Sequence, residues 1–321
     1  MTAEATPYRV MLYRNMLDTI GNTPLVELQN LSPSPAVRFF AKLEGQNPTG
    51  SVKDRIAKAM IEQAEREGVL TPGCTILEPT SGNTGVSLAF VAKLKGYKVK
   101  VVMPDNMSPE RTALLRAYGA EIVYSDGPKG TNGSITVAQE MADADKSLIM
   151  LYQYGNDMNP GAHYEGTGPE ILRDLPEIDV FVAGLGTGGT LTGTARYLKE
   201  RKPGIKIVAA APHPGDRVQG LRSLDEGFIP PVLDQSLLDG RIVVDSKNSF
   251  AATKELMEKD GIFAGISGGA VLRAAQRTAS RLEQGNIVLL LADGGWKYLS
   301  TDLWNVDYED LAEDLDDQTW W

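Results

Sequence analysis

The sequence predicts an α/β protein in which mostly parallel sheets are covered by helices. Strand-like and helix-like segments alternate through most of the 321 residues, and this alternation is typical of parallel sheets with helices packed on their faces. The length fits about two domains. With 42% hydrophobic and 23% charged residues, the chain has enough apolar side chains for sizeable cores, which argues against a disordered protein.

The predicted elements follow one another in regular order. Pro109 directly after Ser108 marks a helix start, because serine caps helices and proline suits their first turn. Apolar side chains recur at helical spacing in residues 54–67, and Gly68 follows them. Strands are predicted at 37–43, 75–77, 98–103, 121–124, 180–183, 206–210 and 287–291, and helices at 54–67, 86–94, 109–119 and 250–259, with one more ending near Lys199.

No internal repeat or low-complexity linker divides the chain. Short crossings between domains are expected near Asn47 and near residues 156–160, where asparagine and proline interrupt the pattern. We therefore predict a smaller domain at 47–158 and a larger one formed by 12–46 and 159–306.

The charge is unevenly distributed. The net charge of −10 disfavours nonspecific binding to nucleic acid or to an anionic membrane. Residues 307–321 hold seven acidic residues and no basic ones, which leaves −3 for the rest of the chain. Such a segment is usually a solvated tail. It ends in Trp320 and Trp321, and because indoles favour burial, packing onto the body or a partner is the alternative.

The sequence also predicts a cellular location. No apolar run approaches the length of a membrane span, and the N-terminal residues lack the pattern of a secretory signal. The single cysteine, Cys74, cannot form an internal disulfide, which fits a reducing compartment. We expect a cytoplasmic protein without a membrane span.

A glycine-rich turn at 184–190 follows a predicted strand and opens a helix. Its backbone N–H groups, together with the helix dipole, suit a phosphate group. The turn also matches the G-x-G-x-x-G pattern of NAD-binding proteins, but that fingerprint requires an acid at the end of the next strand. Residues 208–212 contain none, so the turn predicts a phosphate site for another ligand, with an NAD-dependent oxidoreductase as the weaker alternative.

Two further turns are rich in glycine and hydroxyl groups. Residues 265–269 fit the G-x-S-x-G pattern of serine hydrolases. That chemistry needs a histidine after the serine, and the only histidines, His163 and His213, precede it, so a structural or surface role is predicted for both. Residues 80–85 place hydroxyls, an amide and backbone N–H groups at a strand-to-helix turn, which suits a small carboxylate.

Lys53 lies at the start of a predicted helix, where the helix dipole disfavours a positive charge. A lysine, a phosphate site and a carboxylate-binding turn together meet the needs of pyridoxal 5′-phosphate (PLP): an imine, a phosphate anchor and an amino-acid clamp. A non-catalytic binding protein remains the alternative if Lys53 does not hold a cofactor.

At this point the sequence resembles the fold-type II PLP enzymes, and within them the cysteine synthase family. The resemblance covers about residues 16–301 and is carried by the segments 20–26, 47–55, 78–85, 166–170, 186–190, 264–270 and 298–301. It implies a fold like that of the tryptophan synthase β subunit, with two domains. The domain at 47–158 would be the mobile substrate clamp, and the larger one would hold the cofactor phosphate.

The resemblance also implies roles for individual residues. Lys53 would form the Schiff base with the cofactor and act as the general base. The other cofactor contacts would come from Asn83 at the 3′-oxygen, from Ser267 at the pyridine nitrogen, and from Gly186, Thr187, Gly188, Gly189 and Thr190 at the phosphate. The substrate carboxylate would be held by Thr80, Ser81, Thr84 and Gln153. The implied reaction is β-replacement through an α-aminoacrylate intermediate, and no metal is implied.

The segment 218–230, together with 150–156 and 293–298, resembles the O-phosphoserine-dependent branch, cysteine synthase B. In that segment Arg222 suits a phosphate ester, because its planar guanidinium binds two oxygens and stays charged. A surface arginine beside Asp225 and Glu226 is the alternative.

This branch takes its sulfur from a small carrier protein with a C-terminal thiocarboxylate and is expected to be a homodimer. Under that reading the acidic tail is a candidate lid over the active site. An O-acetylserine sulfhydrylase that uses sulfide is the nearest rival, and a cystathionine β-synthase is a more distant one.

Overall fold

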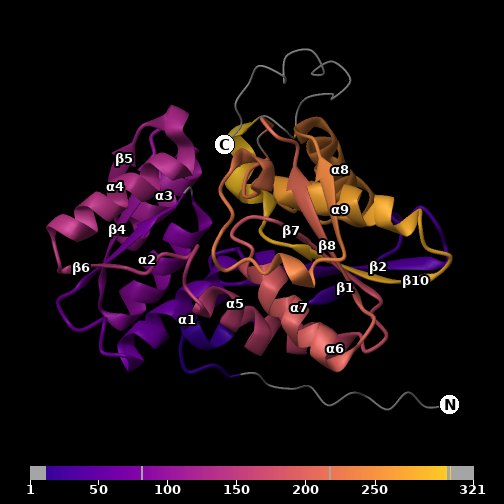
Figure 1. The fold of residues 1–321 in the computed structure, drawn as a ribbon, viewed down its shortest axis with the longest axis horizontal. Coiled ribbons are helices and arrows are strands. Elements are labelled where there is room, and N and C mark those ends of the chain that lie inside the picture. Colours follow the sequence, from indigo (N-terminus) through magenta and orange to yellow (C-terminus); the bar gives the residue numbers. More distant parts are fainter. Residues whose placement is uncertain (1–11, 81, 217, 302–303, 305–321) are drawn as a thin grey trace.

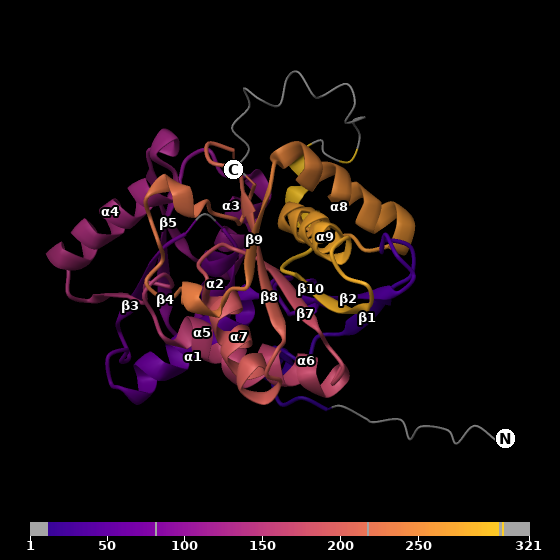
Figure 2. The same cartoon turned by 45° about the vertical axis from the view of Figure 1, so that its right-hand side comes forward.

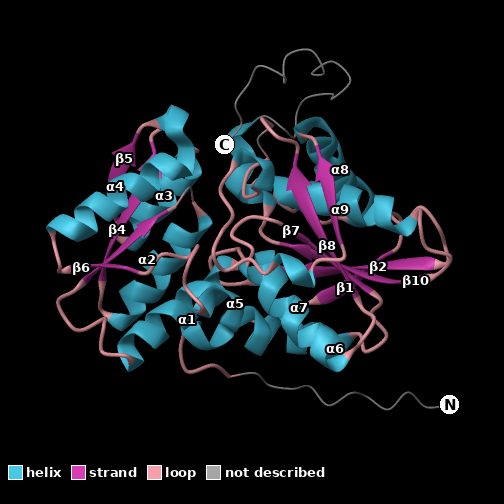
Figure 3. Ribbon diagram, in the orientation of Figure 1, coloured by secondary structure: helices cyan, strands magenta, loops and turns pink. Residues whose placement is uncertain are grey.

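Two separate, mostly parallel sheets form the framework of the protein (Figures 1 and 3). The computed structural model describes residues 12–80, 82–216, 218–301 and 304. The smaller sheet has the strand order β5-β4-β3-β6, with all neighbours parallel. Its strands are β3 (Thr75–Pro79), β4 (Lys98–Pro104), β5 (Glu121–Ser125) and β6 (Leu148–Met150).

The larger sheet has six strands in the order β1-β2-β10-β7-β8-β9. All neighbours are parallel except the edge pair β1 and β2. The strands are β1 (Leu25–Leu28), β2 (Val37–Leu43), β7 (Val180–Gly184), β8 (Lys206–Pro212), β9 (Gly240–Val244) and β10 (Gly285–Leu291). The predicted α/β class with mostly parallel sheets is confirmed.

Helices cover both faces of each sheet (Figure 2). The smaller sheet is flanked by α1 (Lys53–Arg66), α2 (Asn83–Lys95), α3 (Pro109–Tyr118) and α4 (Gly130–Ala144). On one face of the larger sheet lie α6 (Gly168–Asp174) and α7 (Gly189–Arg201), and on the other α8 (Ser246–Asp260) and α9 (Ile266–Ala279). Helix α5 (Met158–Ala162) packs against both α7 and α1. Helices on both faces explain why the central strands are apolar throughout.

Strand β7 shows how the core of the larger sheet is divided. Val180 and Val182 pack in the cluster that includes α8 and α9, whereas Phe181 and Ala183 pack in the cluster that includes α7. Successive side chains of a strand point to opposite faces, so one strand contributes to both clusters. Each of these four side chains is at most 1% exposed, and burying one Val or Phe stabilises the fold by about 1.5–3 kcal/mol.

Most predicted elements are present, with shifted ends. The helix predicted at 54–67 is α1, which begins at Lys53, and the helix predicted at 86–94 is α2, which begins at Asn83. The sequence pattern does not predict α9, because Gly268 and Gly269 in its first turn disfavour a helix. A Cβ atom at Gly269 would collide with the backbone oxygen of Ser249 in α8, so the close packing of α8 on α9 requires glycine there.

Among the described residues, no helix combines the length and the apolar character that crossing a membrane requires. The acidic segment 307–321 lies outside the described residues.

Candidate active site

A pocket opens where the carboxyl ends of parallel strands from the two sheets face each other. Strands β3, β7 and β10 end at Pro79, Gly184 and Leu291, and the loops that follow them supply its walls. Ligands of parallel α/β sheets bind at this position. The inner part of the pocket, called here the inner pocket, is lined by Lys53, Asn83, Gly186, Thr187, Gly188, Thr190, Ser267, Asp293 and Tyr298, among others.

The glycine-rich turn after β7 forms one wall of the inner pocket. Gly188 is the N-cap of α7 with φ +88, a conformation that favours glycine, and no side chain caps the helix. The Thr187 hydroxyl accepts a hydrogen bond from Asn159 Nδ2 (2.9 Å), and the Thr190 hydroxyl lies 3.1 Å from His163 Nε2. Backbone N–H groups at an uncapped helix N-terminus, with two oriented hydroxyls beside them, suit a phosphate.

Lys53 faces the same pocket from the first turn of α1. Within the described part of the chain, no side chain or carbonyl accepts a hydrogen bond from its ammonium group. Burial lowers the pKa of Lys53, and the nearby Asp293 carboxylate opposes that shift. A lowered pKa increases the neutral amine fraction, which is the nucleophilic form. Position and charge therefore suit a lysine that reacts with a carbonyl group.

Asn83 lies between two charged side chains that the sequence pattern did not assign to the site. Its Nδ2 donates to Asp293 Oδ2 (2.6 Å), and its Oδ1 accepts from Lys297 Nζ (2.8 Å). Asp293 Oδ2 also accepts from the Tyr298 hydroxyl (2.7 Å), while Asp293 Oδ1 is buried without a hydrogen-bond partner. The only available signal was their place in the family-like segment 293–298, because neither burial nor contact is visible in a sequence.

A second part of the pocket, the outer pocket, adjoins the inner one and shares Lys53, Asn83 and Thr187 with it. Its lining contains the predicted substrate residues Thr80, Thr84, Gln153 and Arg222. Of the other predicted site residues, Ser81 lies outside the described residues, and Gly189 is the first residue of α7, packed against Asn159. The structure thus brings most of the predicted residues together around Lys53.

Gln153 is held from two sides. The Thr84 hydroxyl donates to its Oε1 (2.7 Å), and its backbone N–H donates to Glu78 Oε1 (3.0 Å). Glu78 Oε2 accepts from the backbone N–H of Tyr152 (2.8 Å). Burial raises the pKa of Glu78 to about 8, although these backbone hydrogen bonds lower it. Glu78 thereby fixes the loop that presents Gln153 to the outer pocket, a role the sequence did not reveal.

Arg222 enters the outer pocket from the loop after β8. Its guanidinium carbon lies 4.6 Å from the centre of the Phe228 ring and 5.5 Å from that of Tyr154. Its NH1 donates to Asn132 Oδ1 (3.2 Å). Among the described residues, no carboxylate forms an ion pair with Arg222, and Asp225 pairs with Arg241 instead (3.1 Å). The guanidinium charge therefore remains available to an anion.

His163 and His213 contribute no nucleophile–base pair. His163 is fully buried and its two ring nitrogens contact the hydroxyls of Thr167 and Thr190. His213 is exposed, and its Nδ1 contacts Pro214 O. In the described residues neither imidazole bonds to Ser267, so the G-x-S-x-G pattern here forms the N-terminal turn of α9 rather than a hydrolase site.

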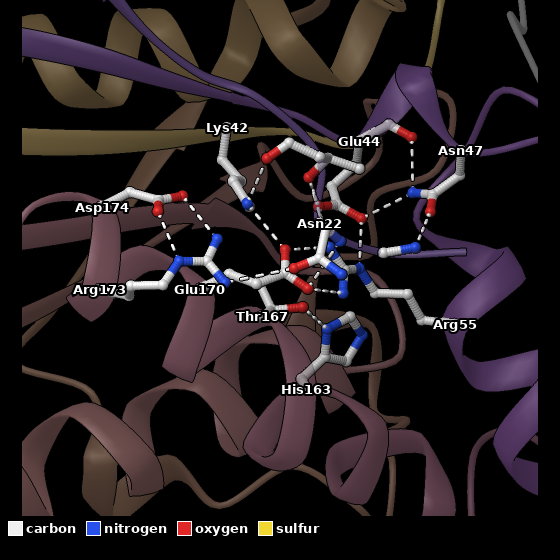
Figure 4. Close-up of polar contacts among 12 residues, drawn as sticks. Asn22, Lys42, Glu44, Asn47, Arg55, His163, Thr167, Glu170, Arg173 and Asp174 are labelled. Atoms are coloured by element: carbon white, nitrogen blue, oxygen red, sulfur yellow. Dashed lines mark hydrogen bonds and ion pairs between the residues drawn. The ribbon is translucent and has the colours of Figure 1, made fainter. Parts of the chain in front are cut away.

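Beside the pocket lies a buried ion cluster of Lys42, Glu44, Arg55 and Glu170 (Figure 4). Arg55 bridges both carboxylates: its Nε donates to Glu44 Oε2 and its NH1 to Glu170 Oε1, each at 2.7 Å. Lys42 Nζ lies 2.8 Å from Glu170 Oε2. Burial alone would raise the pKa of Glu170, but hydrogen bonds from Arg55 lower it to about 2. The cluster joins β2, α1 and α6.

Comparisons with known proteins agree with this geometry. The model of the family described as pyridoxal-phosphate dependent enzyme matches residues 16–293. A protein named cysteine synthase from Staphylococcus aureus (strain Mu50) is 44% identical over 303 residues, which cover 91% of this chain and 97% of that protein.

Solved structures are similar over nearly the whole chain. A cysteine synthase (OASS) from Entamoeba histolytica matches with a TM-score of 0.88 at 34% identity, over 99% of this chain and 100% of that one. A hydrogen sulfide-producing enzyme from Fusobacterium nucleatum matches with a TM-score of 0.86 at 42% identity, over 90% of this chain and 100% of that one.

Proposed function

The chain belongs to the cysteine synthase family of pyridoxal-phosphate dependent enzymes, and from this premise we propose that it makes L-cysteine by β-replacement on O-phospho-L-serine. Its family and its cofactor, PLP, follow from the matches over residues 16–293 and over 91% of the chain. The choice of phosphoserine as substrate rests on Arg222.

The pocket fits PLP. The cofactor needs an amine for its aldehyde and donors for its phosphate, and the inner pocket offers the Lys53 amine without a hydrogen-bond acceptor among the described residues and the uncapped N-terminus of α7. Under this proposal Ser267 faces the pyridine nitrogen and Asn83 the 3′-oxygen. When bound, PLP supplies an electron sink for the charge that develops at the substrate α-carbon.

The protein's own residues then perform four tasks. Thr80, Thr84 and Gln153 bind the substrate carboxylate in the outer pocket. Lys53 Nζ removes the α-proton, for which burial and a lowered pKa suit it. Arg222 binds the leaving phosphate dianion as the Cβ–O bond breaks. A sulfur nucleophile then adds at Cβ, and Lys53 returns the proton to the α-carbon.

The observation that carries the phosphoserine proposal is the position of Arg222. It lines the same pocket as Lys53, and its charge is not paired with a carboxylate among the described residues. A guanidinium recognises a phosphate ester through charge-assisted hydrogen bonds, whereas an acetyl ester offers it no charge. The name OASS on the Entamoeba structure makes O-acetylserine with sulfide the second candidate.

The decisive experiment is stopped-flow absorbance of the holoenzyme mixed separately with O-phosphoserine and O-acetylserine. We expect a fast change of the cofactor spectrum with phosphoserine and a slow one with acetylserine. The reverse order would make the enzyme an acetylserine sulfhydrylase and would remove Arg222 from substrate recognition.

The proposal extends to the sulfur source, a small carrier protein with a C-terminal thiocarboxylate. A cleft that includes Thr131, Asn132 and Arg222 continues outward from the outer pocket, and it gives the end of a protein chain a route toward Lys53. Turnover should be faster with a thiocarboxylated carrier than with equal concentrations of sulfide. Equal or better use of sulfide would contradict this part of the proposal. We also propose a homodimer, which light scattering would test.

A further inference from the structure

Lys297 is a fully buried lysine beside the cofactor pocket, and the proposed reaction gives it no task. It lies in the 3₁₀ segment Gly295–Thr301 and is 0% exposed. The hydrogen bond from its Nζ to Asn83 Oδ1 measures 2.8 Å. Burial lowers the pKa of Lys297 to about 8, while the charges of Asp293 and Asp54 oppose that shift. Lysines are seldom fully buried without a specific partner.

The charges around Asn83 determine which way its amide points. The oxygen and nitrogen of an asparagine amide are nearly the same size, so hydrogen-bond partners decide the orientation. Here a cation contacts Oδ1 and a carboxylate contacts Nδ2. A flipped amide would place its oxygen against Asp293 and its NH₂ group against Lys297, two repulsive contacts in a buried environment.

The fixed orientation leaves one donor free. Nδ2 carries two hydrogens, and one of them serves Asp293 Oδ2. Asn83 also lines both the inner and the outer pocket, so its second N–H is available to a ligand there. That N–H requires an acceptor, and the 3′-oxygen of PLP is one.

We propose that Lys297 is a positioning residue that holds the Asn83 amide with its N–H directed at the 3′-oxygen of the cofactor. Asp293 fixes the same amide from its other side by accepting a hydrogen bond from Nδ2. The inference rests on the proposed contact between Asn83 and PLP and adds the residues that orient it. Lys297 itself does not touch the cofactor.

The test compares PLP with 3-deoxypyridoxal phosphate, which lacks the 3′-oxygen. Full-length holoenzyme is loaded with either compound, and the rate of its release is followed by visible absorbance. In Lys297→Met, we expect PLP to be released about 10-fold faster, in line with the loss of a well-oriented hydrogen bond. Release of the deoxy analogue should change less than about 2-fold, because it has no acceptor for the Asn83 N–H.

Three further variants make the result specific. Lys297→Gln keeps an N–H donor in the buried space and guards against a variant that does not fold; it should keep more of the preference for PLP than Lys297→Met does. In an Asn83→Ala background, Lys297→Met should have no additional effect, as expected for two residues that act through one contact. Lys58→Met, which removes a lysine that donates to Leu17 O outside the pocket (3.1 Å), should leave both release rates unchanged.

The outcomes separate this inference from the proposed site. Equal acceleration for both compounds in Lys297→Met, or additive effects of Lys297→Met and Asn83→Ala, would each overturn the positioning role. If Asn83→Ala itself releases PLP and the deoxy analogue with the wild-type preference, the proposed contact between Asn83 and the cofactor fails instead.

Discussion

Two groups of polar and charged side chains lie close together in the interior of this protein, and they differ in how completely they are hydrogen-bonded or ion-paired. In the ion cluster of Lys42, Glu44, Arg55 and Glu170, Arg55 donates to both carboxylates and Lys42 pairs with Glu170. In the pocket cluster of Lys53, Asn83, Asp293 and Lys297, Asp293 Oδ1 has no partner, and nothing in the described residues accepts from the Lys53 ammonium group.

The difference teaches how to distinguish a structural cluster from a binding site. A buried charged group is stabilised by a partner of opposite charge or by hydrogen bonds. Without them its pKa shifts toward the neutral form, or a bound ligand supplies the missing partner. The ion cluster compensates itself: Glu170 remains ionised with a pKa of about 2 and joins three elements of the fold. The pocket cluster does not compensate itself, and burial lowers the pKa values of both Lys53 and Lys297. Its unused hydrogen-bond donors and acceptors are available to a cofactor and a substrate.

Replacing Lys53 with alanine should produce the largest effect. The variant loses both the attachment point for the cofactor and the proposed general base, so turnover should fall by at least about 10³-fold. The visible absorbance of the holoenzyme should also change. Thermal unfolding of the chain without cofactor should be unchanged or slightly more favourable to the folded state, because a partly buried amine that no described residue accepts from is removed. Turnover at the wild-type rate would refute the role of Lys53.

Disrupting the ion cluster should have the opposite effect to Lys53→Ala: the free energy of unfolding should fall, while the cofactor site of the folded enzyme stays intact. Glu170→Gln leaves Arg55 and Lys42 without a carboxylate that both now contact. We expect the free energy of unfolding to fall by about 3–5 kcal/mol, measured in urea, while the cofactor spectrum of the folded enzyme stays the same.

The matched control for that variant is Asp174→Asn. Asp174 pairs with the exposed Arg173 at 2.7 Å, and such a surface pair contributes about 0–1 kcal/mol. If both variants lose a similar free energy of unfolding, the ion cluster stabilises the fold no more than a surface ion pair does.

The sequence predicted the fold class, Lys53 and the glycine-rich turns around the pocket, because these leave local patterns, but it did not predict Asp293 and Tyr298, which also line the pocket. Glycine-rich turns after strands and a lysine at a helix start are visible in the printed residues, and the structure places Lys53, Asn83, Thr187 and Ser267 around one pocket. Their individual roles stay predictions, as do the domain limits.

The compensating charges could not be predicted in the same way. Glu44 and Arg55 lie 11 residues apart, but Arg55 and Glu170 are separated by 115, and Asn83 and Lys297 by 214. These partners meet only after the sheets have formed, and a sequence pattern carries no record of which distant charge fills a buried space. Helix α9 was missed for a related reason, since its glycines serve packing against α8.

Arg222→Ala tests whether the outer pocket also holds an uncompensated charge that binds substrate. A charge-assisted contact contributes about 1.5–3 kcal/mol, so kcat/KM with O-phosphoserine should fall about 10- to 150-fold. The value with O-acetylserine should change little. Arg241→Ala is the control, because Arg241 pairs with Asp225 of the same loop and should alter neither value. Equal losses with both donors would remove Arg222 from the leaving-group site.

The smallest expected effect concerns His163, which connects the two regions. It lies beside Arg55, and its Nε2 contacts the hydroxyl of Thr190 in the proposed phosphate site. Burial and the charge of Arg55 lower the pKa of His163 to about 3. Below about pH 6.5 the unfolded chain therefore binds a proton at this position that the folded chain does not. The free energy of unfolding should fall as the pH decreases from about 6.5 toward 3, by up to about 1.4 kcal/mol per pH unit from this residue.

His163→Gln removes that proton uptake and keeps a side chain able to bond Thr190. Between pH 6.5 and 5, the free energy of unfolding in urea should fall by about 1.6 kcal/mol more for the wild type than for the variant. The carboxylates of the ion cluster contribute equally to both proteins, so the difference isolates the imidazole. Parallel pH profiles would mean that His163 titrates normally in the folded protein. In that case the folded protein would tolerate a second cation beside Arg55, and the ion cluster would be better solvated than its contacts indicate.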